Sequence, residues 1–272
     1  MSLQQYLASL YEVLNHPFNR KHQGMTLARI LFWKINQSFF HFPALVELDP
    51  GVKCLCYPDS SYGSMVVYNR WAEYNVMSNI VSFLKTNSIY IDVGANIGDT
   101  TIIAAAHTQN KIYAFEPSPV AYPRLQENIA LNKLGSQVVA EKLVLSNHRG
   151  YTSFIEAQTS ETSHISPKKE NVGLRVRTTT LDDYSQKNAL KTIDLLKIDV
   201  EGAELLVLKG AARLLRAHQI RHLLIELNPN ACQYGYTNTE TILYLKQFGY
   251  RVSKVPVNVD ERIVNIHAYS MR

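Results

Sequence analysis

The 272-residue chain is 46% hydrophobic and 19% charged, which is ordinary for a globular protein and argues against disorder. Its net charge of +5 comes from scattered basic residues, such as the pairs Arg20-Lys21 and Lys168-Lys169, so no nucleic-acid-binding stripe is predicted. Three cysteines, Cys54, Cys56 and Cys232, favour neither a disulfide framework nor a zinc site. With no evident signal peptide and no apolar run of about 18 residues, we expect a cytoplasmic protein.

Residues 1–88 are predicted to form an N-terminal cap of mixed elements. Apolar residues recur at helical spacing in 3–14, 27–35 and 76–84, whereas 46–57 carries a turn between short apolar runs, typical of a hairpin. The stretch Met25 to Phe42 is apolar and aromatic but interrupted by polar residues. We expect it to be a helix against the core, with a membrane or a partner as the alternative.

From Ile89 onward, short apolar runs alternate with helix-like segments. The predicted strands are 89–93, 111–115, 137–145, 193–198, 222–227, 250–255 and 263–269, and the predicted helices are 100–107, 120–131, 203–217 and 240–248. This alternation predicts an α/β domain over 89–272, with a mostly parallel sheet covered by helices on both faces. Ligands bind such sheets beyond the carboxyl ends of the strands, so chemistry is expected after strands one, two and four.

An insert from Tyr151 to Tyr184 interrupts this alternation. It holds two extended runs, Tyr151 to Glu156 and Leu174 to Thr180, around the polar stretch Thr159 to Asn171. Two interpretations remain open at this stage: a mobile loop over the site, or a plain hairpin on the sheet edge.

The first motif is Asp92-Val93-Gly94-Ala95-Asn96-Ile97-Gly98, after the first strand, and Asp99-Thr100 continues it into a helix. Its glycines permit a tight turn and a close ligand approach, and the helix start offers free N–H groups. Asp92 can accept a hydrogen bond from an ammonium group. This chemistry suits the amino-acid end of S-adenosylmethionine (SAM) better than a pyrophosphate, and the spacing differs from the three-glycine dinucleotide motif.

The second motif is Phe115-Glu116-Pro117-Ser118, at the end of the second strand. An acid there can accept both ribose hydroxyls, so Glu116 indicates adenosine binding without naming the cofactor. Taken alone, the same acid could simply stabilise the start of the next helix.

The third motif is Lys197-Ile198-Asp199-Val200-Glu201-Gly202-Ala203-Glu204, at the end of the fourth strand. Asp199 and Glu201 are candidates to bind substrate hydroxyls, remove a proton or hold a divalent cation such as Mg²⁺. Glu204 is interpreted as a helix-capping acid. Glu226, at the end of the fifth strand, is a third catalytic candidate, with Asn228 beside it; a buried structural role for Glu226 is the alternative.

Together, these motifs and the segments L-L-I-E-L and T-L-D-D-Y make the chain resemble the FkbM family of SAM-dependent methyltransferases over about Trp71 to Tyr250. The resemblance implies a class I methyltransferase fold with a seven-stranded sheet whose last strand is antiparallel. It also implies O-methylation of a sugar or a secondary metabolite. It places Asp92, Gly94, Asn96 and Gly98 around the methionine portion and Glu116 on the ribose, with Ser118 and Asn128 nearby.

One position departs from the family pattern. Relatives often carry an acid in a Leu-Ser-Asp-like turn after the third strand, whereas this chain reads Leu145-Ser146-Asn147-His148. An asparagine carbonyl can accept the same hydrogen bond from adenine. The complete set of expected cofactor contacts is Asp92, Gly94, Asn96, Gly98, Asp99, Thr100, Glu116, Pro117, Ser118, Ser146 and Asn147.

The expected reaction is in-line transfer of the SAM methyl group to a hydroxyl, with Asp199 or Glu201 removing the proton, with or without Mg²⁺. A small-molecule or glycan acceptor is expected, and no nucleic acid. A nucleic-acid methyltransferase, a non-catalytic SAM-binding protein and, less favoured, a nicotinamide oxidoreductase are the alternatives. The sequence leaves the oligomeric state open, a homodimer included.

Overall fold

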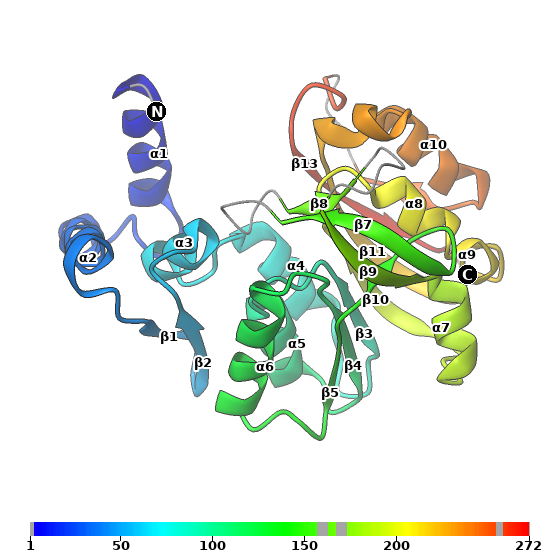
Figure 1. Cartoon of the computed structure of the whole chain (residues 1–272), viewed down its shortest axis with the longest axis horizontal. Coiled ribbons are helices and arrows are strands. Elements are labelled where there is room, and N and C mark those ends of the chain that lie inside the picture. Colours follow the sequence, from blue (N-terminus) through cyan, green and yellow to red (C-terminus); the bar gives the residue numbers. More distant parts are fainter. Residues whose placement is uncertain (1–2, 157–162, 167–172, 254–257, 272) are drawn as a thin grey trace.

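The computed structural model describes residues 3–156, 163–166, 173–253 and 258–271. A seven-stranded sheet lies between two layers of helices (Figure 1). Strands β11, β10, β3, β4 and β5 run parallel to one another, whereas β13 is antiparallel to both β11 and β12. The predicted α/β fold is confirmed, and the sheet is mixed. In spatial order the strands are β12 (Arg251–Val252), β13 (Val264–Tyr269), β11 (Ile220–Leu227), β10 (Ile193–Ile198), β3 (Tyr90–Val93), β4 (Ile112–Phe115) and β5 (Val138–Glu141).

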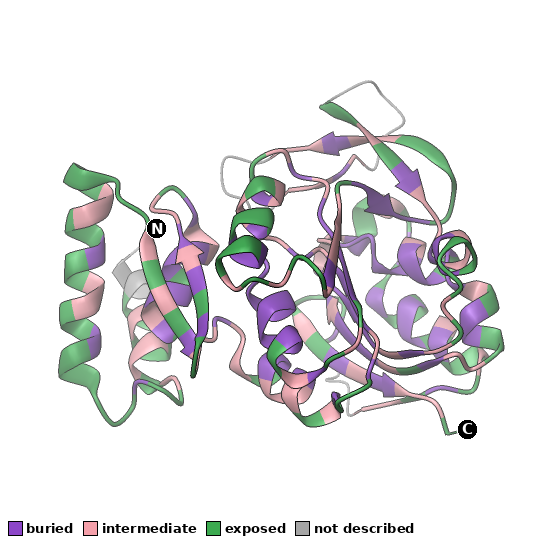
Figure 2. Cartoon of the chain, turned by 90° about the horizontal axis from the view of Figure 1, so that it is seen from below, coloured by how far each residue is buried: buried purple, intermediate pink, exposed green. Residues whose placement is uncertain are grey.

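Both faces of the sheet are buried, which explains why its central strands are mostly apolar, with Asp92, Asp194 and Lys197 as the charged exceptions in β3 and β10. One face packs on α4 (Tyr74–Phe83), α5 (Asp99–His107) and α6 (Ala121–Leu131). The other face packs on four further helices: α7 (Leu181–Lys187), α8 (Glu204–Lys209), α9 (Ala212–Arg216) and α10 (Asn238–Gln247). The burial colours of Figure 2 show the sheet as the centre of the core.

The strand register aligns the ends of the three motif-bearing strands. Ile198 of β10 pairs with Val93 of β3, and Val93 pairs with Phe115 of β4. Since these strands are parallel, the residues that follow them, Asp199, Gly94 and Glu116, emerge at the same edge of the sheet.

Two predicted elements were wrong in extent. The single strand predicted over 137–145 is two strands, because Val144–Leu145 (β6) leaves the main sheet and pairs with another strand. The helix predicted over 203–217 is broken into α8 and α9 around Gly210. A Cβ at that glycine would lie 2.0 Å from the Ser146 carbonyl oxygen, so the helices approach the β6 end too closely for a side chain.

The insert forms a second, four-stranded sheet of order β6-β9-β7-β8. Its other strands are β7 (Gly150–Ile155), β8 (His164–Ile165) and β9 (Leu174–Thr179), so the two predicted extended runs are confirmed as strands. Most of the stretch Thr159 to Asn171, over which a loop was predicted, lies outside the described residues; 163–166 are described, as β8 and its flanks.

The N-terminal region contains α1 (Leu3–Asn15), α2 (Gln23–Ile35), a π-helical turn η1 (Asn36–Phe40), the hairpin β1 (Ala44–Asp49)–β2 (Val52–Cys56) and α3 (Ser61–Asn69). The hairpin confirms its prediction, whereas α3 and α7 were not predicted. One hydrophobic cluster joins this region to α5. It contains residues of the hairpin and of α3, together with Trp33 of α2, so the N-terminal region is packed onto the sheet domain. The boundary between residues 88 and 89 stays a prediction.

Cys54 and Cys56 lie buried in this shared cluster as free thiols, and Cys232 is free and exposed. Among the helices within the described ranges, none combines the length and the apolar character needed to cross a bilayer.

Candidate active site

A cavity of about 590 Å³ opens where β3, β4, β10 and β11 end. Its volume is that of a site for a drug-sized ligand or cofactor. Seven predicted site residues line it: Gly94, Asn96, Glu116, Pro117, Asp199, Glu201 and Glu226. The strand ends therefore bring together both the predicted cofactor motifs and the predicted catalytic acids.

The turn after β3 is built on glycine because its backbone conformation and its packing both require one. Gly94 has φ of +81°, and a Cβ there would lie 1.8 Å from the Asp199 carbonyl oxygen. The N–H groups of Gly94 and Ala95 both donate to the Phe115 carbonyl, at 3.0 and 3.1 Å. The turn thus ties the ends of β3, β4 and β10 together and leaves the Gly94 backbone facing the cavity.

Asp92 lies beneath this turn and is fully buried. Its Oδ2 accepts hydrogen bonds from the Thr100 and Thr101 hydroxyls, both at 2.7 Å, and its Oδ1 lies 3.8 Å from Lys197 Nζ. Asp92 does not line the cavity. In this geometry it fixes the helix start and compensates a buried ammonium; its predicted contact with the cofactor stays a prediction.

Glu116 stands at the cavity wall with both carboxylate oxygens aligned by the backbone. Oε2 accepts from the Asn96 N–H at 2.8 Å, and Oε1 accepts from the Ser118 N–H at 2.9 Å. Burial raises the pKa of Glu116 to about 7, against the lowering effect of these two N–H groups. Each oxygen keeps a further lone pair, so the carboxylate is oriented and can still accept hydroxyl hydrogens from a ligand.

Three carboxyl groups converge at the other side of the cavity: Glu73 before α4, Asp199 after β10 and Glu226 in β11. One oxygen of each lies within 4.8 Å of the others. Burial and the Asp199 charge raise the pKa of both Glu73 and Glu226, and a hydrogen bond joins those two carboxyls. Such close acids cannot all ionise, so the pair Glu73–Glu226 retains a proton near neutral pH.

Lys197 supports this acidic group from below. Its Nζ lies 3.1 Å from Asp199 Oδ2, and the side chain is almost fully buried. Burial alone would lower the pKa of Lys197, but the Asp199, Asp92 and Glu73 carboxylates raise it well above its usual value. One ammonium thus faces three carboxyls, and the surplus negative charge points into the cavity.

The described lining contains five acids, Glu73, Glu116, Asp199, Glu201 and Glu226, and neither lysine nor arginine. Such a wall complements a positively charged ligand group and disfavours an anionic one.

Glu201 has different backbone geometry and different contacts from Asp199. It has φ of +56°, and its Oε2 accepts a hydrogen bond from Asn228 Nδ2 at 2.8 Å. It lines the cavity but does not belong to the three-acid group. Glu204 is buried and accepts from the Gly202 N–H at 2.8 Å, a local role in keeping with the predicted capping function.

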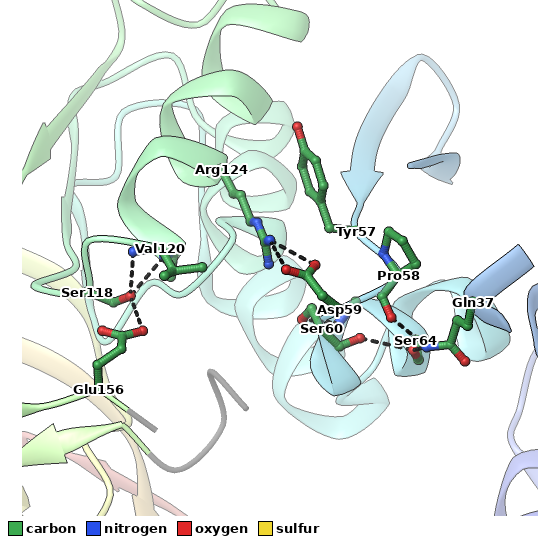
Figure 3. A network of polar contacts seen from close by, with 12 residues as sticks. Gln37, Tyr57, Pro58, Asp59, Ser60, Ser64, Ser118, Val120, Arg124 and Glu156 are labelled. Atoms are coloured by element: carbon green, nitrogen blue, oxygen red, sulfur yellow. Dashed lines mark hydrogen bonds and ion pairs between the residues drawn. The ribbon is translucent and has the colours of Figure 1, made fainter. Parts of the chain in front are cut away.

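The other predicted cofactor residues support the cavity from outside its lining. The Ser118 hydroxyl accepts from the Val120 N–H at 3.0 Å and donates to Glu156, which holds the start of α6 (Figure 3). Asp99, with its pKa raised by burial to about 6, accepts from the Tyr62 hydroxyl at 3.0 Å. Gly98, Thr100, Ser146 and Asn147 also lie off the lining. Their direct contact with a cofactor stays a prediction.

Several lining residues were missed from the sequence. The wall includes Tyr62, Met65 and Glu73 from the N-terminal region, Leu143 near β6, and Phe154 from the second sheet. None of them belongs to a motif at a strand end. Asn128, predicted to lie near the cofactor, instead joins the hairpin to the turn: its side chain accepts from the Leu55 N–H and donates to the Ile97 carbonyl.

Comparison with known proteins identifies the family. The family model "Methyltransferase FkbM domain" matches residues 92–252, more than half of the chain. The chain therefore belongs to the FkbM methyltransferase family, as its motifs predicted.

Three curated relatives illustrate the family. Methyltransferase sdnD of Sordaria araneosa is 33% identical over 48% of this chain and 62% of its own length. The hexuronic acid methyltransferase AglP of Haloferax volcanii is 26% identical over 57% of this chain and 62% of its own length. The 2-O-methyltransferase NoeI of Sinorhizobium fredii is 26% identical over 68% of this chain and 82% of its own length. The chain thus matches less than two thirds of the length of the first two relatives.

Proposed function

We propose that the chain is a SAM-dependent methyltransferase that methylates a hydroxyl group of a neutral sugar-like or secondary-metabolite acceptor. The observation that carries this proposal is the cavity at the strand ends, whose titratable wall is acidic and free of lysine and arginine among the described residues. Family membership supports methyl transfer, the name of the 2-O-methyltransferase NoeI supports an oxygen acceptor, and the name of AglP supports a sugar-derived acceptor, there an acidic one. The strand order is compatible with the class I architecture expected from the resemblance.

The residues present fit SAM. Glu116 is oriented to accept hydrogen bonds from the ribose hydroxyls, and Asn96 Oδ1 is a buried acceptor with no partner in the described structure. The acidic wall suits the two cationic groups of SAM, its ammonium and its sulfonium. When bound, SAM would supply an electrophilic methyl group that needs no further activation.

The acceptor hydroxyl must lose its proton as its oxygen bonds to the methyl carbon, and the carbon–sulfur electron pair stays on sulfur. We assign the proton acceptor to the three-acid group rather than to Glu201. Asp199 carries its charge against Lys197 and lies beside the cavity, whereas Glu226 is held protonated by burial and by Asp199. Asp199 therefore receives the proton, and the Glu73–Glu226 pair orients the hydroxyl by hydrogen bonding.

A second candidate role for the three carboxyl groups is to bind a divalent cation. One oxygen of each lies within 4.8 Å of the others, close enough for all three to coordinate the same ion. The Mg²⁺ considered from the sequence would then lie between Asp199, Glu73 and Glu226 rather than between Asp199 and Glu201. Equal turnover with added EDTA and with added Mg²⁺ would reject this role.

The test begins with calorimetric binding of SAM, S-adenosylhomocysteine and NAD, followed by transfer of labelled methyl to neutral glycosides and uronates. We expect SAM binding, with neutral acceptors methylated faster than uronates. Asp199→Asn should lower kcat by about 10²-fold or more while SAM binding is retained. Glu204→Gln is the matched control, since it removes a buried acid of the same motif that lies off the cavity lining.

Four outcomes would contradict the proposal. Full turnover by Asp199→Asn would reject the proton acceptor. A preference for uronates would reject the electrostatic argument on the acceptor. Retention of SAM without transfer to any acceptor would favour a non-catalytic SAM-binding protein, and transfer to RNA or DNA would favour the nucleic-acid alternative.

A further inference from the structure

Helix α2 and the η1 turn after it present an exposed apolar face, which we call the outer face. It consists of Met25, Leu27, Leu31, Phe32, Ile35, Phe39, Phe40 and Phe42, all more than one third exposed and reaching 76% at Phe39. Along α2 these residues recur at helical spacing on the side opposite the buried Thr26 and Trp33. Figure 1 shows α1 and α2 at the end of the molecule away from the sheet domain, and Figure 2 shows this end as mainly exposed.

The orientation of α2 is fixed by polar contacts on its inner side. Trp33 Nε1 donates to Ser64 Oγ at 2.9 Å, and Gln37 Nε2 donates to the Pro58 carbonyl at 2.7 Å (Figure 3). Arg29 donates to the Asn19 side chain and to the Tyr68 carbonyl. Rotating the helix to bury the outer face would break these contacts. The apolar exposure is therefore built into the fold, and a contiguous exposed face of this kind marks an interaction surface.

Along the chain, the charged side chains next to the outer face are of one sign. No Asp or Glu occurs between Glu12 and Glu47, whereas Arg20, Lys21 and Lys34 lie in that interval and are exposed. Within the described ranges, no carboxylate lies within ion-pair distance of these three cations. Lys34 follows Leu31 by three residues, so its ammonium flanks the apolar stripe.

We infer that the outer face docks on an anionic phospholipid bilayer, with α2 lying along the membrane surface. The pattern of phenylalanines and leucines on one face, flanked by lysine and arginine, is that of an interfacial helix. Thirteen residues rise about 20 Å, less than the roughly 30 Å of a hydrocarbon core, so α2 would lie on the bilayer rather than cross it. A second copy of the chain is disfavoured, because a two-fold contact would bring two sets of unpaired cations together.

The inference does not depend on methyl transfer, since α2 contributes no residue to the cavity lining. It adds where the proposed methyl transfer would take place. Helix α3, which packs on α2, contributes Tyr62 and Met65 to the cavity. A membrane-docked chain would thus hold the cavity near the lipid surface.

The test is flotation of the full chain with phosphatidylcholine vesicles, with or without phosphatidylglycerol. We expect flotation only with phosphatidylglycerol present, weakened by salt. Leu31→Ser should lower the partition coefficient roughly tenfold or more, and Lys34→Glu by a similar factor. The matched control is Leu243→Ser, an exposed leucine of α10 (50% against 61% for Leu31), which should change nothing.

Thermal unfolding of all three variants should match the wild type, since the replaced side chains are exposed. Absence of flotation, or flotation unaffected by Leu31→Ser, would overturn the inference. Equal flotation on neutral vesicles would overturn its anionic part. Light scattering that shows a dimer dissociated by Leu31→Ser would assign the face to a second copy instead.

Discussion

Replacing Lys197 by methionine tests whether one buried ammonium holds the acidic site together. Methionine preserves most of the side-chain length and removes the charge. The Lys197 ammonium lies 3.1 Å from Asp199 Oδ2 and 3.8 Å from Asp92 Oδ1, and the lysine is 5% exposed. Its loss would leave Asp92, which is fully buried, as an anion with no cationic partner.

The magnitude follows from the environment of Asp92. Removing one partner of a buried ion pair costs about 3–5 kcal/mol. The two threonine hydroxyls that donate to Asp92 Oδ2 remain and partly solvate the charge, so we expect the lower end, about 3 kcal/mol. In a chain of this size, that loss lowers Tm by about 6–12 °C.

The assay is thermal unfolding of Lys197→Met, of Asp92→Asn and of the double variant. Because Asp92→Asn removes the anion that Lys197→Met leaves unpaired, the double variant should lose about 1–2 kcal/mol less than the two single losses combined. Lys209→Met, which replaces an exposed lysine of α8, is the control and should leave Tm unchanged. A Tm of Lys197→Met within 2 °C of the control, roughly 1 kcal/mol or less, or strictly additive losses, would refute the reasoning.

Three further predictions concern residues in or near the turns around the cavity. Gly94→Ala forces a Cβ against the Asp199 carbonyl at positive φ and should abolish SAM binding and destabilise the chain by more than about 2 kcal/mol, as measured by calorimetry and thermal unfolding. Burial raises the pKa of Glu204 to about 8, so the stability it contributes below pH 4.5 is lost as pH rises to about 8; unfolding titrations should show this decline reduced in Glu204→Gln. Asn128→Ala leaves the Leu55 N–H and the Ile97 carbonyl without their Asn128 partner and should lower the free energy of unfolding by more than about 1 kcal/mol. A smaller loss in thermal unfolding would show that these two hydrogen bonds do not stabilise the fold.

The regular part of the fold was predictable because it depends on local pattern. The strand predicted over 193–198 coincides with β10, and the predicted hairpin, α4, α5 and α6 differ from the structure by only a few residues at their ends. These segments are buried on one or both sides, so their apolar spacing carries the signal. The motif residues followed from the same rule, since parallel strands end at a common edge.

The unpredicted features depend on contacts between distant segments. The helix break lies at Gly210, within a sequence that reads as one helix, and the Ser146 carbonyl of another segment occupies the space that a side chain would need there. Likewise, Val144–Leu145 pairs with β9, a strand more than 25 residues further along the chain, rather than with the main sheet. Glu73 belongs to none of the sequence motifs. It lies beside Asp199 and Glu226 because α4, which it precedes, packs against the sheet. One sequence gives no access to such pairings.

The division of the cavity wall between two regions affects how acceptor choice can change. Glu116 and the Gly94 turn lie within the family match, whereas Tyr62, Met65 and Glu73 precede it. A chimera that joins residues 1–88 of this chain to the remainder of another family member would therefore keep Tyr62, Met65 and Glu73 in the wall and take the rest of the cavity from the other parent. A change of acceptor in such a chimera would measure how much the first 88 residues contribute to acceptor choice, separately from the strand-end acids.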